Sequence, residues 1–251
     1  MNKLISIGCS YTEHYIHTET KLDFPRWPEL LADKLDMDCV NLGKRGMGQE
    51  YMVAQLLDTL IAEKNISLVV IMWSEWQRMD FKFRSGKGTA GWIAIHPHRD
   101  NSKIERYPIN REGRLALLEH NNVLAATMRS LRFFLIAQKL LKDIPYLMLQ
   151  GCNPLNLQSE TDEVNWEEVT KIRKQSIEQI LDSPITDEIY KDKFIGWPVF
   201  NRIGGYCADN ILDKLDPDRI KLRVSGNDTH PNGDGHKVIS DHIYNTYKKI
   251  Y

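Results

Sequence analysis

The sequence is as informative in what it lacks as in what it contains. It has no uninterrupted apolar run near the ~20 residues that a membrane-spanning helix needs, so we expect no membrane span. Its N-terminal apolar run is not followed by a small-residue cleavage site, so we expect no signal peptide and a cytoplasmic location. It also lacks internal repeats, low-complexity linkers and shifts in composition. We therefore expect residues 1–251 to form a single domain.

Charge and metal-ligand patterns are equally sparse. Thirty-three Lys and Arg residues nearly balance 34 Asp and Glu residues, which gives no basic field for nucleic acid or for a membrane surface. The four cysteines are scattered without CxxC spacing, and we expect reduced thiols. His96 and His98 lack a third ligand nearby in the sequence, so we predict no metal site.

Strand-like and helix-like segments alternate along the chain. Buried strands are expected at residues 3–7, 38–42, 66–73 and 145–149, with an edge strand at 220–224. Helical patterns lie between them, near residues 28–35, 49–64, 115–142, 160–181, 208–215 and 235–247. This order predicts an α/β protein with a central parallel sheet covered on both faces, in three α/β/α layers. Residues 82–113 show no clear period and are predicted to be a long loop insertion.

Chemically useful residues follow these strands, where ligands bind in open α/β sheets. They are Ser10 and Tyr11, then Arg45, Gly46 and Gly48, then Ser74, Glu75 and Arg78, then Cys152 and Asn153, and finally Asn227, Asp228 and His230 before the last helix. A serine hydroxyl becomes a good nucleophile when a base takes its proton, and the base needs an acceptor that fixes its tautomer. Amides of a glycine turn can stabilise a developing oxyanion. Strand alternation points Cys9 away from Ser10, which favours a packed thiol over a rival nucleophile.

Three short blocks resemble the SGNH/GDSL hydrolases. They are Gly8-Cys9-Ser10-Tyr11-Thr12, Asn41-Leu42-Gly43-Lys44-Arg45-Gly46-Met47-Gly48-Gln49 and Asp228-Thr229-His230-Pro231. The resemblance implies a flavodoxin-like SGNH hydrolase fold, with Ser10 as nucleophile, His230 as base, and the amides of Ser10 and Gly46 as oxyanion donors. Gly196-Trp197-Pro198 and Gly204-Gly205-Tyr206 are similar to divergent members carried by tailed bacteriophages. That likeness implies a location in the host-cell cytoplasm or on the virion.

The chain departs from the family pattern at two positions. The family's acid lies three residues before the histidine, where this chain has Asn227, whereas Asp228 lies two before it. We favour Asp228, because a carboxylate stabilises an imidazolium better than an amide does. The third block should supply an asparagine, but the matching stretch is Trp73-Ser74-Glu75-Trp76. Gln49 or Asn153 are alternative donors. The candidate substrate-binding residues are Tyr11, Arg45, Gly48, Gln49, Trp73, Glu75 and Asn153.

The resemblance implies an esterase that cleaves a small acyl ester, such as a carbohydrate O-acetyl group, through an acyl-enzyme and without a cofactor. The expected partner is therefore a small acyl ester or an acylated glycan, and neither nucleic acid nor membrane. Two alternatives stay open. One is a catalytically weak SGNH-like module that binds glycan or has a structural role on a virion, favoured by the missing third-block asparagine. The other is an acyltransferase that uses the same triad.

Overall fold

A five-stranded parallel sheet forms the centre of the protein. The structure is a computed structural model that describes residues 2–14, 23–84, 90–96, 112–113, 116, 122–155 and 166–251. The strands of this sheet are β1 (Lys3–Gly8), β2 (Asp38–Asn41), β3 (Ile66–Trp73), β6 (Tyr146–Gln150) and β7 (Phe194–Ile195). Their spatial order is β2-β1-β3-β6-β7, and every pairing is parallel. This is the flavodoxin-like order, so the predicted fold class is confirmed.

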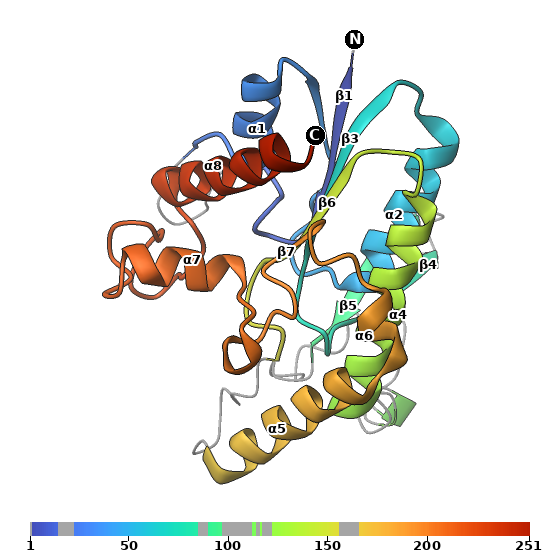
Figure 1. Ribbon diagram of the computed structural model, residues 1–251, viewed down its shortest axis with the longest axis vertical. Coiled ribbons are helices and arrows are strands. Elements are labelled where there is room, and N and C mark those ends of the chain that lie inside the picture. The colour runs from blue at the N-terminus through green and yellow to red at the C-terminus, as the bar shows by residue number, and fades with distance from the viewer. Residues whose placement is uncertain are drawn as a thin grey trace.

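Helices cover both faces of this sheet (Figure 1). On one side α1 (Trp27–Leu35) packs against α8 (Gly233–Ile250), and on the other α2 (Gln49–Ala62) packs against α4 (Val123–Leu140). Further along the chain lie α5 (Trp166–Asp182), α6 (Pro184–Glu188), the short 3₁₀ helix η2 (Asn201–Ile203) and α7 (Ala208–Leu215). In the described residues, no helix combines the length and apolarity needed to cross a membrane.

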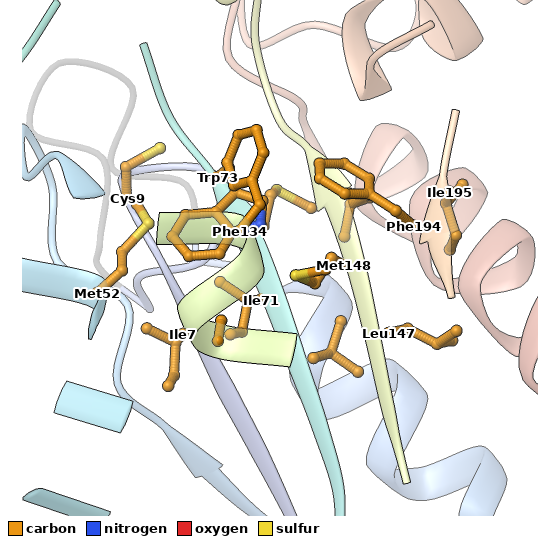
Figure 2. Packing of buried hydrophobic residues seen from close by; sticks show 14 of the residues in the cluster. Ile7, Cys9, Met52, Ile71, Trp73, Phe134, Leu147, Met148, Phe194 and Ile195 are labelled. Carbon is orange, nitrogen blue, oxygen red and sulfur yellow. The ribbon is translucent and has the colours of Figure 1, made fainter. Parts of the chain in front are cut away.

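The three central strands are buried on both faces, which explains why their sequences lack alternation. Ile7, Ile71 and Met148, on neighbouring strands, have no exposed surface (Figure 2). Beyond them, the ring of Phe134 from α4 lies 5.0 Å from the rings of both Trp73 and Phe194. The packed aromatic cluster fixes the carboxyl end of β3 and the start of β7. It thereby holds the edge where functional side chains are expected.

The edge strand predicted at residues 220–224 is wrong. Only Arg223 of that segment makes a β-bridge, to Pro231. The amides of Lys221 and Leu222 donate instead to the carboxylate of Asp216, at 2.8 and 2.9 Å, so they cannot extend a sheet. The fifth strand is the two-residue β7, in a segment whose sequence pattern does not predict a strand.

The loop prediction for 82–113 is also wrong at its start. Strands β4 (Met79–Arg84) and β5 (Ala90–Ile95) form an antiparallel hairpin, with Phe81 opposite Ile93. Apolar residues at every second position of β4 provide the period that the surrounding charges obscured. The hairpin packs against α2. Residues 85–89 and 97–111 lie outside the described part, as do most residues of the predicted helical stretches before Val123 and Trp166.

Candidate active site

Ser10 lies in a tight turn directly after β1. The amides of Thr12 and Glu13 both donate to the carbonyl of Cys9, at 2.9 and 3.0 Å, and this closes the turn. Gly8 is required there, because a Cβ atom at that position would lie 2.2 Å from Oγ1 of Thr12. Cys9 is 1% exposed and belongs to the core, in agreement with a packed thiol. The turn leaves the side chain of Ser10 partly exposed at the sheet edge.

Three side chains from opposite ends of the chain form a hydrogen-bonded series. Oγ of Ser10 lies 2.8 Å from Nε2 of His230, and Nδ1 of His230 lies 2.6 Å from Oδ1 of Asp228. An ionised carboxylate can only accept, so Nδ1 carries the proton and Nε2 is the acceptor for the serine hydroxyl. In this tautomer the imidazole is ready to take a proton from Ser10.

The loop before α8 orients the acid and the base. The amide of His230 donates to Oδ1 of Asp228 at 3.0 Å, and the amide of Asp228 donates to Oγ of Ser225 at 3.0 Å. The side chains of His230 and Asp228 are 36% and 24% exposed, which leaves them accessible to a ligand. Asn227 is exposed, and within the described part of the chain it makes no hydrogen bond with His230. The geometry therefore favours Asp228 over Asn227 as the acidic partner.

Gly46 lies in a turn beside the end of β1. The turn is held there because the amide of Lys44 donates to the carbonyl of Gly8 at 3.0 Å. Gly46 has a φ of +76°, a left-handed conformation that favours glycine. Within the described part of the chain, neither the Ser10 amide nor the Gly46 amide donates a hydrogen bond. Both amides are therefore available for an oxyanion.

The β4–β5 hairpin secures this glycine turn through Asp80. Its Oδ1 accepts the amide of Gly48 at 2.8 Å, and its Oδ2 accepts the amide of Tyr51 at 3.0 Å. Gly48, the N-cap of α2, has no side chain to do this. Burial raises the pKa of Asp80 to about 7, while the two amide donors act in the opposite direction. Sequence reasoning missed Asp80, because a cap donated from a distant strand leaves no local signal.

The Gly48 amide is consequently occupied, which argues against the predicted substrate contact at Gly48. A Cβ atom there would also lie 2.8 Å from Cβ of Arg78, so the glycine serves close packing.

The stretch Trp73-Ser74-Glu75-Trp76, together with Arg78, holds the glycine turn through the carbonyl of Met47. Oγ of Ser74 and Nη1 of Arg78 both donate to the carbonyl of Met47, at 3.0 and 3.2 Å. Glu75 forms an ion pair with Arg78 at 2.9 Å and is 16% exposed. Trp73 is fully buried, and that burial argues against the predicted substrate contact by Trp73. The side chains of this segment therefore hold the turn through a backbone carbonyl and not through its amides.

The remaining candidate binding residues fall into two groups. Tyr11 and Gln49 are buried, at 5% and 1% exposure. Both polar atoms of the Gln49 amide lack a hydrogen-bond partner among the described residues. Arg45 and Asn153 are exposed at the rim: Nε of Arg45 lies 3.0 Å from Oε2 of Glu13, and the side-chain oxygen of Asn153 accepts the amide of Leu155. Arg45 and Asn153 are accordingly the candidates that a ligand can reach directly.

The described residues contain no candidate metal site. Among them, no group of three or more His, Cys, Asp or Glu side chains could hold a metal ion. Of the histidines considered as metal ligands, His98 lies outside the described part. His96 is buried, and its Nε2 would lie 3.6 Å from a Cβ atom at Gly46. His96 therefore adjoins the glycine turn, a position that the sequence did not predict.

Comparison with solved structures finds similar chains among lipolytic proteins and esterases. A member of the lipolytic G-D-S-L family from Veillonella parvula is 13% identical, with a TM-score of 0.46, and the alignment covers 100% of this chain and 98% of that one. The psychrotrophic esterase EstA from Pseudoalteromonas sp. is 15% identical, with a TM-score of 0.47 and coverage of 99% and 98%. A catalytic mutant of the acetylxylan esterase Axe2 from Geobacillus stearothermophilus is 15% identical, with a TM-score of 0.44 and coverage of 98% and 94%. No protein-family model and no curated protein sequence matches the chain.

Proposed function

We propose that this chain is a serine hydrolase that cleaves small acyl esters. The observation that carries the proposal is the series of two short distances, 2.8 Å from Ser10 Oγ to His230 Nε2 and 2.6 Å from His230 Nδ1 to Asp228 Oδ1. A nucleophile, a base and an orienting acid in this order are the requirements for acyl transfer by a serine. Two unoccupied amides, on Ser10 and Gly46, complete the set of groups that the reaction needs.

The reaction proceeds in two halves. Oγ of Ser10 attacks the ester carbonyl carbon while Nε2 of His230 takes the hydroxyl proton, and Asp228 stabilises the resulting imidazolium. The amides of Ser10 and Gly46 bind the oxyanion of the tetrahedral intermediate. Collapse of the intermediate breaks the ester bond, and the leaving alkoxide takes the proton from Nε2. Water, deprotonated by Nε2 of His230, then attacks the carbonyl carbon of the acyl-enzyme. The bond between that carbon and Oγ of Ser10 breaks, Oγ takes the proton back from Nε2, and the carboxylic acid leaves.

The proposed substrate is an acylated glycan, with an O-acetyl group as the acyl group to test first. This part of the proposal rests on the sequence resemblance, because a fold and a triad do not name a substrate. The proposed bacteriophage-type membership and the location in the host-cell cytoplasm or on the virion rest on the same resemblance. The single-domain organisation of residues 1–251 rests on the absence of internal repeats, low-complexity linkers and shifts in composition. They stay predictions.

A fluorophosphonate probe and p-nitrophenyl acetate test the proposal. We expect labelling and turnover that disappear in Ser10→Ala. Cys9→Ala is the matched control, because it removes the neighbouring nucleophile; labelling should persist, since the Cys9 thiol is buried. An unlabelled wild-type protein would overturn the proposal.

Two outcomes distinguish the alternatives. Absence of labelling together with glycan binding would favour a catalytically weak module, the alternative motivated by Ser74 in the stretch where the family supplies an asparagine. Labelling with slow hydrolysis that accelerates when a sugar acceptor is added would favour an acyltransferase.

A further inference from the structure

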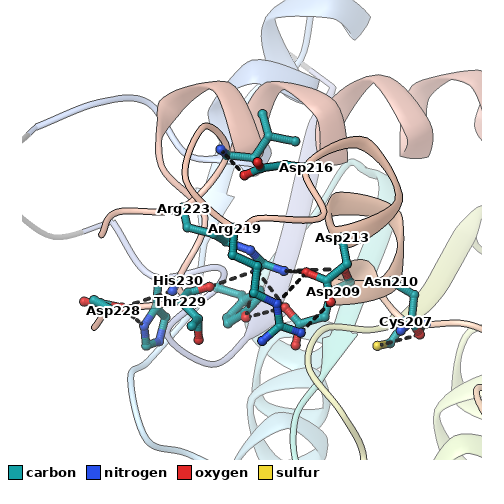
Figure 3. Close-up of polar contacts among 12 residues, drawn as sticks. Cys207, Asp209, Asn210, Asp213, Asp216, Arg219, Arg223, Asp228, Thr229 and His230 are labelled. Carbon is teal, nitrogen blue, oxygen red and sulfur yellow. Dashed lines mark hydrogen bonds and ion pairs between the residues drawn. The ribbon is translucent and has the colours of Figure 1, made fainter. Parts of the chain in front are cut away.

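A buried arginine lies behind the loop that carries Asp228 and His230 (Figure 3). Arg223 is 2% exposed. Its Nη1 donates to the carbonyl of Thr229 at 2.8 Å and to Oδ1 of Asp209 at 2.8 Å, and its Nη2 donates to Oδ1 of Asp213 at 2.7 Å. Thr229 is the residue between the acid and the base. The guanidinium therefore joins α7 to the peptide that separates the two proposed catalytic side chains.

Tyr11 extends this network to the nucleophile. Its hydroxyl donates to Oδ1 of Asp209 at 2.6 Å, and its ring lies 5.3 Å from the imidazole of His230. Burial raises the pKa of Tyr11 well above 10, and the charge of Asp209 acts in the same direction, so the hydroxyl stays a donor. Tyr11 directly follows Ser10. One set of contacts thus connects the turn of the nucleophile with the loop of its base.

The loop needs this support, because it contains no regular secondary structure between Arg223 and Pro231. Its backbone is held by the amide of Val224, which donates to the carbonyl of His230, and by the amide of Ser225, which donates to that of Asp228. The carbonyl of Thr229, which lies between these two acceptors in the sequence, is fixed by Arg223. A rotation of this peptide would displace both triad side chains, and a displacement of about 1 Å can reduce a rate by roughly 10²-fold.

Ordinary packing does not account for a buried arginine at this place. Desolvation of buried charges offsets much of their attraction, and apolar side chains of similar size are often equally stabilising. The planar guanidinium instead offers several donors in a fixed arrangement, which a carbonyl and two carboxylates can occupy at once.

We propose that Arg223 is a positioning residue for the Ser10–His230–Asp228 series, acting on the Thr229 carbonyl with Asp209 and Tyr11 as its anchors. This inference rests on the proposed hydrolase function.

The variant Arg223→Lys tests this positioning role, and Arg219→Lys serves as its control. Lysine keeps the charge but loses the fixed set of donors. Arg219 is a matched control, because its Nε also donates to Asp213, at 3.1 Å, while its side chain is 51% exposed and makes no hydrogen bond with Thr229 in the described residues. We expect Arg223→Lys to lower kcat for p-nitrophenyl acetate by about 10²-fold with little change in KM, and Arg219→Lys to leave both unchanged.

A second measurement does not require turnover. The His230 Nδ1 proton that bonds to Asp228 should give a downfield proton NMR resonance in the wild type and in Arg219→Lys. This resonance should shift or broaden in Arg223→Lys. If wild type is neither labelled nor active, the proposed function fails, yet the resonance still tests the role of Arg223.

Wild-type kcat and an unchanged resonance in folded Arg223→Lys would overturn the inference. If Arg223→Lys does not fold, Tyr11→Phe replaces it, since this variant keeps the buried ring and removes only the hydroxyl contacts with Asp209 and Arg223. A lower kcat and a shifted resonance in Tyr11→Phe support the inference, and wild-type values of both contradict it.

Discussion

Asp228 and His230 lie two residues apart, and the carboxylate of the first accepts both the amide and the Nδ1 proton of the second on the same oxygen, at 3.0 and 2.6 Å. The backbone contact holds Oδ1 of Asp228 within hydrogen-bond distance of Nδ1 of His230. In the proposed mechanism Asp228 orients His230, a role that the SGNH/GDSL pattern resembled by this sequence assigns to a residue one position earlier. This difference makes the identity of the acid testable with two neighbouring substitutions.

Asp228→Asn should lower kcat by about 10⁴-fold, because an amide cannot both hold the tautomer and stabilise the imidazolium. Asn227→Ala should leave kcat nearly unchanged, since Asn227 is exposed. Steady-state hydrolysis of p-nitrophenyl acetate measures both. A large loss in Asn227→Ala with a small one in Asp228→Asn would reassign the acid.

Gly46→Ala should lower both stability and turnover. The left-handed φ of +76° costs an alanine about 1–2 kcal/mol, whereas the new Cβ atom would meet only Nε2 of His96, at an ordinary 3.6 Å. Gly204→Ala is the matched control, since Gly204 has a φ of +84° and a Cβ atom added there would meet nothing within 4 Å.

Chemical denaturation and ester hydrolysis, measured on both glycine variants, separate strain from catalysis. The two variants should lose similar free energies of unfolding, and only Gly46→Ala should lose kcat. Equal turnover in the two variants would remove Gly46 from the oxyanion site.

The sequence predicted the sheet well because its central strands are buried on both faces. Continuous apolar runs such as residues 66–73 have few other interpretations. The strand prediction for residues 220–224 failed because alternation of apolar and polar residues does not specify the hydrogen-bond partners of the backbone amides. The carboxylate of Asp216 takes two of them. The two-residue β7 is too short to give any period.

Only those residues of the candidate site that belong to short sequence motifs could be predicted from the sequence. Ser10, Gly46 and His230 stand out by residue type and by their place after predicted elements. Asp80 and Arg223 act on backbone groups of segments remote in the sequence, and their partners come within reach only when the chain has folded. The distant supports of a site are therefore harder to predict than its reacting groups.

His236 should make the protein less stable in acid. Its Nδ1 accepts the amide of Trp27 at 3.3 Å. Burial lowers the pKa of His236 to about 3 from an ordinary 6.5, with the charges of Arg26 and His230 acting in the same direction. Below pH 6.5 the unfolded chain therefore binds a proton that the folded protein excludes, and the free energy of unfolding falls as pH falls.

His236→Asn keeps an acceptor and does not titrate. Relative to this variant, the wild type should lose about 3 kcal/mol between pH 6.5 and pH 4, measured by urea denaturation at each pH. His242→Asn is the control on the same helix, where burial lowers the pKa of a half-buried histidine, and its effect should be smaller. Parallel pH curves for wild type and His236→Asn would contradict this assignment.

Mutation of Gln49 can show whether its buried amide affects only stability or also turnover. Its amide is 1% exposed and has no partner among the described residues, at the first position of α2 after the glycine turn. A buried polar group without a partner costs about 1–3 kcal/mol. Gln49→Met should therefore stabilise the protein. If the amide replaces the missing asparagine as an oxyanion donor, kcat should fall by about 10²–10³-fold in the same variant.

Gln138→Met is the matched control. Gln138 is also 1% exposed, but its side-chain nitrogen donates to the carbonyl of Glu188 and its oxygen accepts the amide of Tyr190. We expect this variant to be less stable with unchanged kcat, the opposite of Gln49→Met on both measurements. A stabilised Gln49→Met with wild-type kcat would leave Asn153, exposed at the rim, as the remaining alternative donor. Asn153→Ala would then be expected to carry the loss of kcat, because the two unoccupied amides of Ser10 and Gly46 would otherwise act alone.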